Sequence, residues 1–288
     1  MTDFSFAAHA VRLSRLPAGL ARLVCWLTLL LPLTWLQISL SGCAATGAGA
    51  TAMQAEPLTE FDEPETRKRA RIRLTLASNY FEQGQTSVAL DEIKQSLAAD
   101  PSYIPAYVLR GLVYMRMENS VLAEDSFQRA LQINPRDGDA LHNYGWFICE
   151  SGRHAQAIEL FDRALAIPNY GKRVTTQLAK GICQTRAGQL TEAEASFAKS
   201  YELDAANPIT GYNLASLLYR RGEYSRAQFT IRRINNAEFA NAETLWLGIR
   251  VERRLGNATV VEQLAQQLGR RYPQSPQWAL YQRGAFDE

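Results

Sequence analysis

The sequence lacks the short motifs with which many enzymes hold metal ions or phosphate groups. It contains no metal-ligand spacing, no glycine-rich phosphate loop and no G-x-S-x-G nucleophile motif. Its glycines occur instead at regular intervals among apolar residues, which is typical of helix crossings and turns. We therefore predict no catalytic residue, no metal and no cofactor.

Cysteine is scarce, with four residues in 288. His142 and Cys149 lie seven residues apart on one predicted helix, so they share a face and superficially resemble a catalytic dyad. No third residue that could orient the histidine, and no set of oxyanion donors, accompanies them. An enzyme with Cys149 as its nucleophile therefore stays only as an alternative function.

The chain also lacks an excess of charge of one sign. Residues 1–42 carry three Arg and one Asp, and without them 28 basic and 28 acidic residues remain. This balance predicts no basic face for nucleic acid.

The N-terminal segment differs from the rest of the chain. Three arginines precede an apolar run from Leu23 to Leu40, as in a secretion signal. The run ends in Leu40-Ser41-Gly42-Cys43, which resembles the lipobox of bacterial lipoproteins. We expect residues 1–42 to be a signal peptide and Cys43 to be acylated; the alternative is an uncleaved transmembrane helix.

Residues 43–69 are predicted to form the lipidated cysteine and a flexible tether, because small residues without apolar periodicity follow Cys43. Ala44 stands where an Asp would retain an enteric-type lipoprotein in the inner membrane. The resemblance to lipoproteins therefore implies a lipid anchor in the outer membrane, on its periplasmic face.

A repeating unit occupies residues 70–273. A small residue recurs at intervals of 34, 34, 36, 34 and 33 residues, at Ala77, Gly111, Gly145, Gly181, Ala215 and Gly248. A period of 34 is typical of tetratricopeptide repeats. The predicted fold is all-α, with six helix pairs that form a right-handed superhelical solenoid as in that family.

Three local departures from the repeat lead to further predictions. Glu118 replaces the usual turn glycine in the second repeat, so we expect a less tight turn there. The interval of 36 places extra residues at 167–171, where a loop should bulge. Residues 274–288 should fold back as a capping tail over the last repeat.

The first helix of each repeat should line a concave face that binds another protein. The predicted groove is mostly apolar and suits an apolar or amphipathic segment, because the Lys, Arg and Asn residues of carboxylate-clamp repeats are missing from it. The alternative is that superhelical winding or the capping tail buries these side chains. The candidate groove residues are Leu74, Phe81, Val108, Leu112, Met115, His142, Trp146, Leu178, Ile182, Tyr212 and Tyr219.

Cys149 and Cys183 lie on the first helices of consecutive repeats, which should stack side by side. In an oxidising periplasm these two residues could form a disulfide. The alternative is a pair of buried free thiols.

Three segments resemble the PilF/PilW family of type IV pilus biogenesis lipoproteins. They are the lipobox at 40–43, the run Asn143-Tyr144-Gly145-Trp146-Phe147-Ile148-Cys149 with Gly181-Ile182-Cys183 after it, and Leu245-Trp246-Leu247-Gly248-Ile249-Arg250. The resemblance implies a pilotin, which binds secretin subunits and promotes their localisation and multimerisation in the outer membrane. Separately, we expect the chain to be monomeric.

Two other functions stay open within this interpretation. One is a tetratricopeptide scaffold lipoprotein for outer-membrane barrel assembly or cell-wall synthesis. The other is a purely structural protein, against which the apolar groove argues.

Overall fold

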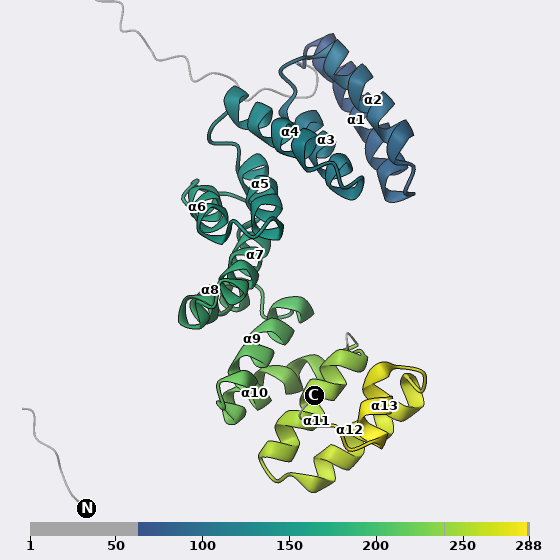
Figure 1. Cartoon of the computed structure of the whole chain (residues 1–288), viewed down its shortest axis with the longest axis vertical. Helices are drawn as coiled ribbons and strands as arrows, with labels where there is room; N and C mark the ends of the chain where they lie inside the picture. Colours follow the sequence, from purple (N-terminus) through teal and green to yellow (C-terminus); the bar gives the residue numbers. More distant parts are fainter. Residues whose placement is uncertain (1–62, 239, 287–288) are drawn as a thin grey trace, which may run out of the picture. The chain divides into compact units, whose positions relative to one another are not determined.

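The fold is all-α over the residues that a computed structural model of the chain describes, 63–238 and 240–286. They belong to one compact unit, Pro57–Glu288. Within these ranges the chain forms thirteen helices and no strand (Figure 1). The signal peptide, the lipobox and most of the tether that the sequence predicts lie outside the described residues.

Twelve of the helices alternate along the chain as the first and second members of six pairs. The first helices are α1 (Glu65–Glu82), α3 (Ile104–Arg116), α5 (Gly138–Glu150), α7 (Arg173–Arg186), α9 (Pro208–Arg220) and α11 (Ala242–Arg254). The second helices are α2 (Thr86–Ala99), α4 (Ser120–Ile133), α6 (His154–Leu165), α8 (Leu190–Leu203), α10 (Tyr224–Asn235) and α12 (Ala258–Arg271). A short helix, α13 (Pro276–Gln282), follows them.

The pairs stack in sequence order, which makes the fold a tetratricopeptide solenoid. Each first helix packs against its own second helix, and each second helix packs against the first helix of the next pair. Figure 1 shows this succession from α1 and α2 to α11 and α12. Because neighbouring repeats make nearly all the contacts, the core follows the stack as a series of four apolar clusters.

The small residue of each repeat lets two helices approach closely. In α5, a Cβ atom at Gly145 would come within 2.9 Å of the Phe161 ring on α6. Phe161 is fully buried, and it fills the space that a larger side chain at 145 would need. The predicted role of the glycine at the helix crossing therefore has a direct steric reason.

The turn inside the second repeat is as tight as the others, so the prediction of a looser turn at Glu118 was wrong. Glu118 adopts a left-handed φ of 57°, near the φ of 77° at Gly152 in the next repeat. Its backbone N–H donates to the Met115 carbonyl over 3.0 Å, as the Gly152 N–H does to Cys149. The repeat geometry imposes the left-handed conformation, although a side chain makes it costly.

The first helix begins at Glu65, earlier than the start at residue 70 that the repeat pattern predicts. Ion pairs favour this extra turn, because Arg67 pairs with Asp100 and Arg71 pairs with Glu63. The charged segment that the sequence assigned to the end of the tether is therefore the first turn of α1.

The longer loop between α6 and α7 does not simply bulge outwards. Tyr170 folds back and is half-buried against the core beside α5, where a Cβ atom at Gly138 would lie 2.5 Å from its ring. Its hydroxyl lies 3.4 Å from an Asp139 carboxylate oxygen, and burial raises the pKa of Tyr170 to about 12.

The C-terminal segment covers the end of the last repeat. Helix α13 packs against α11 and α12, and Trp278 lies against Gly269 of α12. Phe286 stacks on Trp246 of α11 with 5.5 Å between the ring centroids. These contacts bury apolar surface that a further repeat would otherwise cover.

Candidate functional site

The candidate site is the first-helix face, by which we mean the predicted groove residues on α1, α3, α5, α7 and α9. None of these side chains is fully exposed. Val108 and Leu178 are each 8% exposed and belong to the core. These two residues are therefore part of the core and do not line a groove. The remaining members are Leu74, Phe81, Leu112, Met115, His142, Trp146, Ile182, Tyr212 and Tyr219, all half-buried.

The half-buried apolar members of the N-terminal half lean on two neighbouring core clusters. Leu74 and Phe81 pack against the cluster of the first two repeats. Leu112, Met115 and Trp146 pack together with the cluster that runs from α3 to α7. Part of each side chain still reaches the surface, so α3 and α5 present adjoining apolar contacts.

Arginines lie over aromatic members of the face, although the predicted groove positions themselves carry none. The Arg116 guanidinium lies 3.8 Å from the centroid of the Phe81 ring and donates a hydrogen bond to the Phe81 carbonyl. The Arg186 guanidinium lies 5.3 Å from the Trp146 ring, and that of Arg250 lies 4.8 Å from the Tyr219 ring.

The sequence contains these arginines on the first helices, but not at the groove positions of the repeat. Each arginine comes from the first helix of the repeat that follows its aromatic partner. A positively charged group over an aromatic face is attracted by the ring quadrupole. The face therefore combines apolar contacts with positive charge, instead of being apolar alone.

His142 is held by the fold. Its Nδ1 lies 2.8 Å from the Thr176 hydroxyl oxygen on α7, and its ring lies 5.9 Å from that of Phe161. Burial lowers the pKa of His142, and the nearby Lys172 ammonium acts in the same direction. The imidazole is therefore neutral at neutral pH and serves as a packing and hydrogen-bonding group between α5 and α7.

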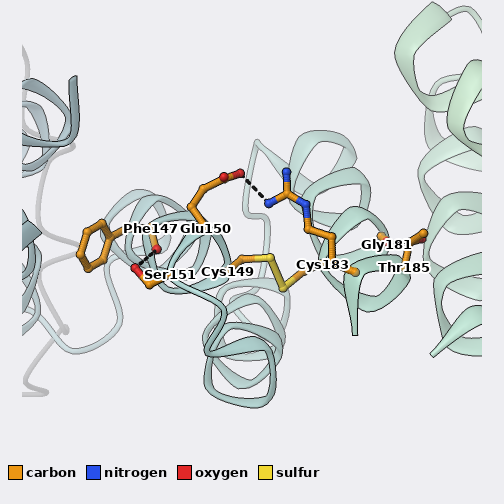
Figure 2. Close-up of a disulfide and its surroundings, with 8 residues drawn as sticks. Phe147, Cys149, Glu150, Ser151, Gly181, Cys183 and Thr185 are labelled. Atoms are coloured by element: carbon orange, nitrogen blue, oxygen red, sulfur yellow. Dashed lines mark hydrogen bonds and ion pairs between the residues drawn. A yellow bond between two sulfur atoms is a disulfide. The ribbon is translucent and has the colours of Figure 1, made fainter. Parts of the chain in front are cut away.

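Cys149 on α5 and Cys183 on α7 are joined by a disulfide (Figure 2). Their Cα atoms lie 5.9 Å apart, within the range that a disulfide requires, and both side chains are buried. The bond links the first helices of the third and fourth repeats. It also occupies the sulfur atom that an enzyme with Cys149 as nucleophile would need as a thiolate.

An ion pair lies beside the disulfide. The Arg186 guanidinium donates a hydrogen bond of 2.6 Å to a Glu150 carboxylate oxygen. Figure 2 shows this bond as the dashed line from Glu150, close to the disulfide. Arg186 thus contacts both Glu150 and Trp146 of the preceding repeat. The disulfide, the ion pair and the cation–π contact together fix α7 against α5.

The most exposed large apolar side chains lie outside the first-helix face. Val121 is 79% exposed on α4 and Phe229 is 73% exposed on α10. Sequence reasoning did not single out either residue, because neither occupies a first helix.

Within residues 63–238 and 240–286, no group of His, Cys, Asp and Glu side chains could hold a metal ion. In the same ranges, no helix has the length and apolar character needed to cross a membrane.

Comparison with protein families identifies the repeat. A family model described as a tetratricopeptide repeat matches residues 74–138, and a second model with the same description matches residues 126–159. These matches cover parts of the first three repeats, consistent with the helix pairs that the structure shows.

Comparison with individual proteins extends over nearly all the repeats. The type IV pilus assembly protein PilF of Pseudomonas aeruginosa is 26% identical over 247 residues, which are 86% of this chain and 95% of PilF. The crystal structure of PilW, a widely conserved type IV pilus biogenesis factor, has a TM-score of 0.67 and 29% identity, over 74% of this chain and 97% of PilW. The structure of Pseudomonas aeruginosa PilF has a TM-score of 0.69 and 25% identity, over 77% of this chain and all of that one.

Proposed function

Because the chain belongs to the PilF/PilW type of tetratricopeptide-repeat proteins, we propose that it serves type IV pilus biogenesis as a pilotin. In this role it binds secretin subunits and promotes their localisation and multimerisation in the outer membrane. The observation that carries the proposal is the extent of the similarity, which covers 86% of the chain.

The proposed anchor is an acylated Cys43, which would hold the helical unit at the periplasmic face of the outer membrane. Ala44, in place of an Asp, supports sorting to that membrane. The disulfide between Cys149 and Cys183 supports an oxidising compartment such as the periplasm, because disulfides are rare in the cytosol. Several acyl chains on one cysteine would make the attachment stable, whereas a single chain binds only marginally.

The proposed secretin contact is the N-terminal half of the first-helix face. Leu112 and Met115 on α3 and Trp146 on α5 lie against one core cluster and leave part of each side chain accessible. An amphipathic segment could place its apolar side chains on them while its polar side stays in water. Because these side chains are already ordered by the core, the protein would lose little side-chain entropy on binding.

The test is the amount of heat-stable secretin multimer in outer-membrane fractions of cells that lack this protein. We expect the multimers to disappear on deletion and to return with the wild-type chain. The C43S variant, which cannot be acylated, should fail to restore them and should leave the outer-membrane fraction. Unchanged multimers in the deletion strain would refute the proposal.

The binding face is tested by substitutions in the restored strain. L112E and W146E should abolish multimers, and the isosteric M115Q should reduce them while it disturbs the fold less. F229E is the matched control, because Phe229 is exposed on a second helix outside the face. Recovery of barrel-assembly or cell-wall proteins in place of secretin, after purification from membranes, would favour the scaffold alternative.

A further inference from the structure

A cavity of about 310 Å³ opens between the first helices of the last two repeats and the capping helix. Helices α9, α11 and α13 supply its walls. It is distinct from the proposed secretin contact, which lies on α3 and α5. Its lining residues are Tyr212, Ser216, Tyr219, Arg220, Glu243, Trp246, Leu247, Arg250 and Gln277.

The helical period explains why these residues meet. Tyr212, Ser216 and Tyr219 are four and then three residues apart on α9, and therefore lie on one face of that helix. Glu243, Leu247 and Arg250 have the same spacing on α11. The two helices pack side by side, so the two lined faces form opposite walls.

Arg250 is the unusual residue of this cavity. Its Nε is buried and has no hydrogen-bond partner among the described residues. Its guanidinium lies 4.8 Å from the centroid of the Tyr219 ring. A buried donor without an acceptor is unfavourable. Nε itself is not accessible to a ligand, but Arg250 is only partly buried and lines the cavity, so an anionic ligand would pair with the other guanidinium nitrogen atoms.

Two other arginines of the first helices each have a hydrogen-bond acceptor. Arg116 donates to the Phe81 carbonyl, and Arg186 donates to Glu150. Within the described ranges, neither Arg220 nor Arg250 forms an ion pair with any carboxylate. The lining therefore carries two positive charges and one negative charge, that of Glu243, which gives a net charge of +1.

The polar groups of the lining suit an anion. Burial raises the pKa of Tyr212, and Glu243 adds to that shift while Arg250 opposes it. The hydroxyl consequently stays protonated at neutral pH and can donate a hydrogen bond. Tyr219 and Trp246 add aromatic surface beside the charged groups.

We propose that this cavity binds the carboxylate of an acidic side chain within a peptide segment of a partner protein, with Arg250 as its main ligand and Arg220 as a second cation. Arginine presents a planar fork that pairs with two carboxylate oxygens. The volume is at the lower limit of pockets that hold small molecules, so it fits one side chain better than a whole metabolite. Apolar residues next to the acidic one would contact Tyr219 and Trp246. The inference does not depend on the secretin proposal, because it concerns other helices.

The test uses the full chain in detergent micelles and two blocked peptides, acetyl-Ala-Phe-Glu-Phe-Ala-amide and its counterpart with Gln in place of Glu. Calorimetry should show that the Glu peptide binds about tenfold tighter or more, as expected for charge-assisted hydrogen bonds. In protein labelled with ¹⁵N-arginine, the Glu peptide should shift the Nε–H resonance that the R250K variant lacks. Equal affinity for both peptides, or no binding of the Glu peptide at millimolar concentration, would overturn the proposal.

Substitutions in the cavity should change the affinity for the Glu peptide in opposite directions. R250Q should reduce the affinity for the Glu peptide to that for the Gln peptide, and R220Q, at an exposed position, should weaken it less. E243Q should strengthen binding, because it removes the one repelling carboxylate. R116Q is the matched control, since Arg116 also stacks on an aromatic ring but lies in another repeat. If R250Q and R220Q both bind the Glu peptide as tightly as the wild type does, the assignment is refuted.

Discussion

The guanidinium of Arg186 on α7 lies 5.3 Å from the ring of Trp146 on α5 and pairs at the same time with Glu150 one turn further along α5. Both partners belong to the preceding repeat, and the disulfide from Cys149 to Cys183 lies beside them. The junction between the third and fourth repeats is therefore held by a covalent bond and two charge interactions. Trp146 also belongs to the face proposed to bind the partner.

The contact between Arg186 and Trp146 should be measurable as a coupling energy. A double-mutant cycle with W146L and R186Q should give about 0.5–1 kcal/mol, the usual strength of a cation–π pair at a partly exposed site. Urea unfolding of the wild type, both single variants and the double variant supplies the four free energies. The E150Q background separates the ion pair from the ring contact. Additive effects of W146L and R186Q would show that the contact contributes nothing.

Loss of the disulfide should lower the stability of the helical unit. Cys149 and Cys183 close a loop of 34 residues. The C149A/C183A variant should lose about 3–4 kcal/mol, because the unfolded chain gains conformational freedom. Reductant should lower the thermal midpoint of the wild type and leave that of the double variant unchanged. A wild-type midpoint that does not respond to reductant, in a sample shown by thiol titration to be reduced, would contradict this.

Replacement of Glu118 by glycine should stabilise the second repeat. Glu118 has a left-handed φ of 57°, which costs a residue with a side chain about 1–2 kcal/mol relative to a favoured conformation. E118G should therefore gain about 1 kcal/mol, or about 2–4 °C in the thermal midpoint of a unit of this size. G152A, at the corresponding turn of the next repeat, should lose stability instead. Destabilisation by both substitutions would mean that the Glu118 side chain matters more than its backbone strain.

The stability of the helical unit should contain a pH-dependent part from His142. Burial lowers the pKa of His142 below its ordinary value of 6.5 in the folded protein. The unfolded chain then binds the proton more readily, so this contribution is fully present above pH 6.5 and is lost as the pH falls through the folded pKa. In H142N the amide can still bond to Thr176 but does not titrate. The difference in unfolding free energy between wild type and H142N should therefore shrink or reverse between pH 7 and pH 5, and a constant difference would contradict the burial of a neutral imidazole.

The repeat itself could be predicted from the sequence because it is a local property. The interval of 34 residues, the glycines at the turns and the small residues at the crossings concern contacts inside one helix pair or between neighbouring pairs. Gly145 illustrates this, since the nearby Phe161 that excludes a side chain there lies only one helix away. The pairing of Cys149 with Cys183 could be proposed for the same reason, because consecutive first helices stack.

Three local features needed the tertiary structure. The conformation of Glu118 follows from the geometry of the turn and overrides the preference of the residue. Tyr170 folds inward because Gly138 leaves room for its ring. The early start of α1 depends on ion pairs with Glu63 and Asp100, and the latter lies beyond α2.

The binding face shows most clearly what the sequence determined and what the tertiary structure decided. The sequence determined which side chains lie on the first helices, since the helical period and the repeat position suffice for that. Only the tertiary structure decided how far each is buried and which arginine of the following repeat lies over it, as Arg116 does over Phe81 and Arg250 over Tyr219. The physical reason is that exposure and charge pairing depend on the distance and angle between neighbouring helices, which the packing of all their side chains sets together.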